Sequence, residues 1–223
     1  MTRSLALACF FVAALSRAAG VSVAFTLTDT KGAPVPDAVV SLVPLDAPPA
    51  LSSSNGAKFM PPATPLEIVQ RGKEFLPFVT PLVVGSTVSF LNRDVVEHQV
   101  YSLSDPKKFE LPLYKPGKVG TVVFDRPGVV IIGCNIHDWM LAYLVVLETP
   151  LFAQTAAAGT ATIADAAPGR YRAEVWHPRL AKSETREVTL LAGAPPATLA
   201  FTLALKPDRR IHRAAGATGG GYK

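Results

Sequence analysis

Residues 129–148 read VVIIGCNIHDWMLAYLVVLE, and they hold two apolar runs on either side of a short loop. Both runs are rich in β-branched and other apolar residues, which predicts two strands. The loop between them carries Cys134, His137 and Met140 in the spacing C-x2-H-x2-M. A strand pair of this kind would hold a thiol, an imidazole and a thioether together on one tight loop.

Similar short strand patterns recur along most of the 223 residues. Twenty prolines and sixteen glycines separate runs that contain valine, threonine, phenylalanine and tyrosine. Hydrophobic residues make up 49% of the chain and charged residues only 17%, and no amphipathic helical pattern of any length is found. Short strands with turn residues between them predict an all-β fold of sandwich or barrel type.

The first 20 residues have the pattern of a secretory signal peptide. Arg3 precedes an apolar run over residues 5–15, and small residues follow. We therefore expect an exported, periplasmic protein with no transmembrane segment in the mature chain; a retained N-terminal anchor is the alternative. Removal of the signal would also remove Cys9 and leave Cys134 as the only thiol. A lone thiol in an exported protein indicates a buried inert side chain, an intermolecular disulfide or a metal ligand.

Charge and motifs exclude several classes of function. The formal net charge is +5, and the basic excess lies mostly in residues 207–223, which we expect to form a disordered basic tail. No basic stripe is interleaved with aromatic residues, so we expect no nucleic-acid partner. The chain also lacks the G-x-S-x-G, H-E-x-x-H and phosphate-loop motifs. We therefore expect a protein that is not an enzyme.

Two distant segments share a second pattern. Residues 25–42 (FTLTDTKGAPVPDAVVSL) and 159–175 (GTATIADAAPGRYRAEV) together resemble the carboxypeptidase regulatory-like domain. The resemblance implies a transthyretin-like β-sandwich made of residues 21–45 and 150–206. Residues 66–149 would then be a second domain inserted in a loop of the first, after a linker over residues 46–65. A plain tandem arrangement of two domains is the alternative.

The C-x2-H-x2-M loop favours a soft metal. Thiolate, imidazole and thioether ligands select copper over calcium or magnesium, but three ligands on one loop cannot enclose an ion. A second imidazole would complete a plane of two histidines and a cysteine with a weak axial methionine. The chain offers four histidines: His98, His137, His177 and His212. His98 lies between two strand patterns, where strand pairing could bring it beside the Cys134 loop.

Each of these residues also has an ordinary structural interpretation. Cys134 could be an inert core thiol, and Met140 could simply fill the core. His98 could be a surface residue of a turn. For His177 we expect ordinary packing or a surface position.

The segment NRDVVEHQV (residues 92–100), followed by C-x2-H-x2-M, resembles the plastocyanin- and amicyanin-like cupredoxins. This resemblance implies a cupredoxin-type Greek-key β-sandwich over residues 66–149 with one type 1 copper. The matching ligands are His98, Cys134 and His137 in the equatorial plane and Met140 in the axial position. Its function would be one-electron transfer between redox partners such as a cytochrome c and a dehydrogenase.

Other residues take supporting roles by the same resemblance. Asn92 would brace the two ligand loops, and Glu97, which stands where the amicyanin-like loop has proline, would hydrogen-bond near the ligands or tune the potential. His137 would be the electron exit. Apolar candidates for the mouth of the site are Val95, Pro112, Leu113, Ile136 and Trp139.

Three broader interpretations stay open. The two-module arrangement resembles exported proteins labelled methylamine utilization protein, although no residue indicates a role in amine oxidation. The chain could instead store or deliver copper without transferring electrons. It could also be a structural β-protein with a degenerate metal site.

Overall fold

The computed structural model describes residues 20–46 and 60–210, and within them the chain forms sixteen β-strands and no helix. The strands are β1 (Val21–Asp29), β2 (Val39–Pro44), β3 (Leu66–Arg71), β4 (Glu74–Leu76), β5 (Val79–Val83), β6 (Ser86–Asn92), β7 (His98–Ser104), β8 (Lys107–Tyr114), β9 (Val119–Phe124), β10 (Gly128–Gly133), β11 (Leu141–Leu147), β12 (Phe152–Gln154), β13 (Thr160–Ala166), β14 (Gly169–Trp176), β15 (Glu184–Leu190) and β16 (Ala197–Leu203). The predicted all-β class is confirmed. The expected signal peptide lies almost wholly outside the described residues, as do most of the expected linker and tail.

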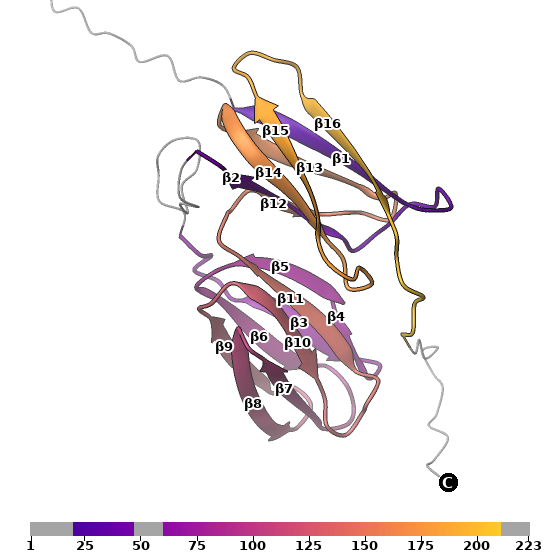
Figure 1. Cartoon of the computed structure of the whole chain (residues 1–223). Helices are drawn as coiled ribbons and strands as arrows, with labels where there is room; N and C mark the ends of the chain where they lie inside the picture. The colour runs from indigo at the N-terminus through magenta and orange to yellow at the C-terminus, as the bar shows by residue number, and fades with distance from the viewer. Residues whose placement is uncertain (1–19, 47–59, 211–223) are drawn as a thin grey trace, which may run out of the picture.

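The strands form two sandwiches, one above the other in Figure 1. The split sandwich consists of a sheet with the order β13-β1-β16 and a sheet with the order β12-β2-β14-β15. The inserted sandwich consists of the sheets β5-β11-β10-β7-β8 and β4-β3-β6-β9. The chain therefore leaves the split sandwich after β2, forms the whole inserted sandwich, and returns at β12. Strands from both sides of the insertion pair directly, as in the register Phe25↔Ala161.

The two-residue period of the strands explains which side chains reach the core of the inserted sandwich. In β6, Val88 and Phe90 are fully buried, and in β7 the buried positions alternate in the same way. Because successive side chains point to opposite faces of a sheet, His98 shares the inward face of β7 with Val100, and both are 0% exposed. The two-residue period of β7 thus points the His98 imidazole toward the apolar core.

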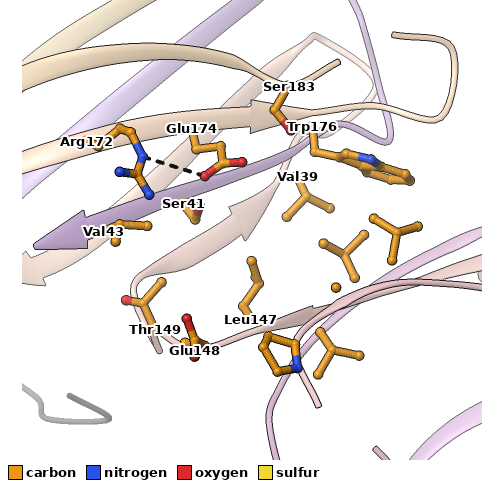
Figure 2. A pocket seen from close by; sticks show the side chains of 15 residues that line it. Val39, Ser41, Val43, Leu147, Glu148, Thr149, Arg172, Glu174, Trp176 and Ser183 are labelled. Atoms are coloured by element: carbon orange, nitrogen blue, oxygen red, sulfur yellow. Dashed lines mark ion pairs between the residues drawn. The ribbon is translucent and has the colours of Figure 1, made fainter. Parts of the chain in front are cut away.

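A small apolar cluster joins the two sandwiches. Val39, Val79 and Val145 are buried there, and partly buried aromatic side chains, including Tyr143 and Trp176, pack against them. A cavity of about 240 Å³ lies beside this cluster. Figure 2 shows Val39 and Trp176 on its walls, together with the ion pair between Arg172 and Glu174. The contact between the sandwiches is therefore apolar but not continuous.

The segment after β16 also contacts both sandwiches. The Lys206 N–H donates to the Arg179 carbonyl at 2.9 Å, and the Arg179 Nε donates to the Lys206 carbonyl at 2.6 Å. Arg210 forms an ion pair with Asp208 at 2.7 Å, and its guanidinium lies 4.2 Å from the centre of the Phe78 ring in the inserted sandwich. Arg210, which belongs to the expected disordered tail over residues 207–223, therefore contacts a distant aromatic ring, and the disorder of the tail stays a prediction.

The tight turn at Gly159 generates a prediction for the fold. Gly159 has a φ of +70°, and a Cβ atom there would lie 2.4 Å from the Leu27 carbonyl oxygen. Gly193 has a φ of +72°, but a Cβ there would meet nothing within 4 Å. We expect Gly193→Ala to cost about 1 kcal/mol for the left-handed backbone, and Gly159→Ala about 3 kcal/mol or more. Urea unfolding of both variants measures this, and equal costs would contradict the structure at this turn.

Candidate metal centre

Three of the predicted ligands lie together at one end of the inserted sandwich. The Cys134 Sγ lies 3.9 Å from Nδ1 of His98 and 3.8 Å from Nδ1 of His137. One ligand atom from each of the three residues falls within 4.8 Å of the other two. The sequence therefore brings a residue of one strand into contact with a loop that begins 36 positions later.

Strand pairing produces this contact. β7 lies beside β10 in antiparallel register, with Tyr101 opposite Gly133. Cys134 directly follows β10, and His98 is the first residue of β7. Because paired antiparallel strands run in opposite directions, the start of β7 and the end of β10 lie at the same end of the sheet.

Burial differs among the predicted ligands. His98 is 0% exposed and Cys134 is 2% exposed, whereas His137 is half-buried. Met140 is 2% exposed and belongs to the same apolar cluster as Cys134. The Met140 N–H donates to the His137 carbonyl at 2.9 Å, which closes the loop as a tight turn. Axial coordination by the thioether stays a prediction.

The surroundings of Cys134 favour the thiolate. Burial raises the pKa of the thiol, but the His98 imidazole and the backbone N–H groups of Gln99 and Ile136 outweigh burial and lower the pKa below its ordinary value. The thiolate is the form that binds metals. The two N–H donors come from both ligand segments, so they also hold the sulfur between them.

The orientation of His98 depends on Asp94, which the sequence analysis did not identify. His98 Nε2 and Asp94 Oδ2 lie 2.7 Å apart, and a hydrogen bond from Nε2–H to the carboxylate turns Nδ1 toward the sulfur. Burial lowers the pKa of His98, but Cys134 and Asp94 together raise it above its ordinary value. A carboxylate four residues before a candidate ligand was the available signal in the sequence.

Asn92 braces the loop that carries His98. Its Nδ2 donates to the carbonyls of Val96 (2.9 Å) and Tyr114 (3.2 Å), and its Oδ1 accepts the Asp94 N–H at 2.9 Å. Asn92 therefore shapes the His98 loop and ties it to β8, and its predicted bracing of the second ligand loop stays a prediction.

The other candidate residues fall outside the cluster of donors. Glu97 is half-buried, and within residues 20–46 and 60–210 its carboxylate has no hydrogen bond or ion pair. Its predicted influence on the site stays a prediction. His177 is buried in the split sandwich, where its Nδ1 accepts the Arg179 N–H at 3.2 Å. His212 lies outside the described residues.

Three of the apolar residues predicted at the mouth of the site are exposed. The exposed fractions of Val95, Leu113 and Ile136 are 94%, 50% and 50%. The His137 ring also lies between two other rings, with centroid distances of 4.9 Å to His98 and 5.3 Å to Trp139. The half-buried His137 ring therefore packs against both the other imidazole and the Trp139 ring.

The donor set suits a single soft metal ion. Metal bonds of about 2.3 Å to a thiolate and about 2.0 Å to an imidazole are compatible with the observed separations between sulfur and each nitrogen. Two imidazoles and a thiolate, with a thioether on the same loop, form the combination typical of copper electron-transfer sites. The residues present therefore fit copper.

Parts of the chain are similar to solved structures of copper proteins. A copper-containing nitrite reductase from Thermus scotoductus SA-01 is 29% identical over 41% of this chain and 24% of its own, with a TM-score of 0.37. A purple cupredoxin from Nitrosopumilus maritimus is 24% identical over 37% of this chain and 99% of its own, with a TM-score of 0.34. Amicyanin from Paracoccus versutus is 18% identical over 40% of this chain and 92% of its own, with a TM-score of 0.36.

These similarities extend over less than half of the chain, which spans about a quarter of the length of the nitrite reductase. No protein-family model matches the chain, and no curated protein matches it. In the part of the chain that the structure describes, no helix is long and apolar enough to cross a membrane.

The buried His177 generates a pH prediction for the scaffold. Burial lowers the pKa of His177 to about 4, and the positive charges of Arg179 and Arg210 contribute to this shift. An unfolded histidine has a pKa of about 6.5, so protonation favours the unfolded chain. The free energy of unfolding keeps the full contribution of neutral His177 above pH 6.5. This contribution falls by about 3 kcal/mol as the pH drops to 4. Urea unfolding across this range should show the loss, and His177→Gln should reduce it; parallel profiles would contradict the assignment.

Proposed function

We propose that the inserted sandwich is a cupredoxin-type domain that binds one type 1 copper ion and transfers single electrons between redox proteins. The observation that carries this proposal is the buried Cys134 sulfur with an imidazole Nδ1 on each side, at 3.9 and 3.8 Å. His98, Cys134 and His137 would be the equatorial ligands, and Met140 the axial ligand. The copper would supply the one-electron couple.

The chain's own residues would keep the donors in place during redox change. His98 is fixed by the Asp94 carboxylate, and the Cys134 sulfur by the N–H groups of Gln99 and Ile136. A site whose donors are held by the fold changes little in geometry between oxidation states, which favours electron transfer. Four protein ligands would leave no open position for a substrate, so we propose no catalysis at the metal.

Partners would dock over the edge of His137. Val95, Leu113 and Ile136, which we predict at the mouth of the site, are exposed apolar side chains, and weak electron-transfer encounters need only a small interface. A cytochrome c or a dehydrogenase fits this role. Residues 1–20 would direct export, so we propose a periplasmic location, where such partners are found.

Loading with Cu(II) tests the metal centre directly. We expect one copper per chain and an intense visible absorption band from charge transfer between the thiolate and the copper. Cys134→Ser should abolish the band because it removes the only thiolate of the site. His177→Gln, which changes a buried histidine in the other sandwich, should leave the band intact. Wild-type protein without the band would refute the proposal.

Replacement of Met140 tests the axial ligand. Met140→Leu nearly conserves volume in the core, so folding should be little affected. Loss of a weak donor should destabilise the oxidised ion and raise the reduction potential, while the visible band persists. Protein-film voltammetry of both forms measures this. An unchanged potential would show that the thioether does not coordinate. In the wild-type protein, an irreversible wave together with ready loss of copper to a chelator would favour copper delivery over electron transfer.

A further inference from the structure

The hairpin turn between β3 and β4 lies between the two ligand loops. Its central residues, Gly72 and Lys73, have φ values of +64° and +58°, as a two-residue type I′ turn requires. Lysine rarely adopts this conformation, because its side chain crowds the following carbonyl. The surrounding structure must therefore hold the turn in place, and residues of both ligand loops contribute hydrogen bonds to it.

On one side, the turn is bound by the loop of His98. Asp94 Oδ1 accepts the Gly72 N–H at 2.7 Å, and Oδ2 accepts the Lys73 N–H at 2.8 Å. The same Oδ2 atom bonds His98 Nε2 at 2.7 Å. The carboxylate that orients the first imidazole is thus itself fixed by the backbone of the turn.

On the other side, the turn is bound by the loop of His137. The Trp139 indole N–H donates to the Lys73 carbonyl at 3.1 Å. The Trp139 ring packs edge to face on His137, with centroids 5.3 Å apart. Trp139, which lies next to the second imidazole, is therefore also fixed by the turn. It binds the carbonyl of Lys73, whereas Asp94 binds the N–H of the same residue.

We propose that the backbone of Lys73 couples the two ligand loops and sets the relative position of the two imidazoles. The connection runs from His98 through Asp94, Lys73 and Trp139 to His137, and it bypasses the metal. Asp94 and Trp139 are then positioning residues, and the Lys73 side chain has no part in the coupling. The consequences for copper rest on the proposed function, whereas the coupling itself exists in the metal-free protein.

The sharpest test changes one loop and observes the other in metal-free protein. Trp139→Phe keeps an aromatic ring beside His137 but removes the indole N–H. We expect faster solvent exchange of the His98 Nε2 proton and of the Lys73 amide, measured by NMR. Trp176→Phe is the matched control, because Trp176 lies between the sandwiches. Lys73→Gly should behave as wild type because it preserves the peptide groups. An unchanged His98 signal in Trp139→Phe would overturn the proposal.

Copper-loaded protein gives the second readout. Trp139→Phe should weaken copper binding about tenfold and shift the reduction potential, as loss of residues that orient ligands commonly does, and Trp176→Phe should do neither. A wild-type protein without the thiolate band would refute the proposed function but not the coupling. A normal wild-type centre with an unchanged affinity and potential in Trp139→Phe would refute the coupling's role at the copper.

Discussion

The pairing of β7 with β10 is the constraint on which the rest of the site depends. It places the first residue of one strand beside the residue that follows the other, and so brings His98 against Cys134. The inward face of β7 then buries the imidazole completely. A buried imidazole needs a polar partner on each nitrogen, and here the partners are a carboxylate and a sulfur. The geometry of the donors is therefore a consequence of strand register.

Electrostatics and packing support each other in this arrangement. Asp94 favours a positive His98 ring, and together with backbone N–H groups that ring favours a negative Cys134 sulfur. The same Asp94 carboxylate binds the hairpin turn that also receives the Trp139 indole. Removing one member would leave a buried polar group without its partner, which costs more than the hydrogen bond itself contributes. The ligand loops are thus held by groups that bind no metal.

Sequence reasoning reached the fold class and two members of the donor cluster from local patterns, and it reached His98 through the resemblance to cupredoxins. Strand periodicity is visible in the chain, and the C-x2-H-x2-M spacing places Cys134 and His137 on one loop. Asp94, Lys73 and Trp139 were not identified as a unit because their hydrogen bonds join three segments distant in sequence. The ordered contact of Arg210 with Phe78 was missed for the same reason, since composition carries no information about a distant ring.

X-ray absorption at the copper edge tests the central claim most directly, because it reports which atoms surround the ion. The account predicts one short sulfur neighbour and two imidazole nitrogens, with the sulfur lost in Cys134→Ser and one nitrogen lost in His98→Ala. A copper environment made only of nitrogen and oxygen, or one unchanged in both variants, would contradict it.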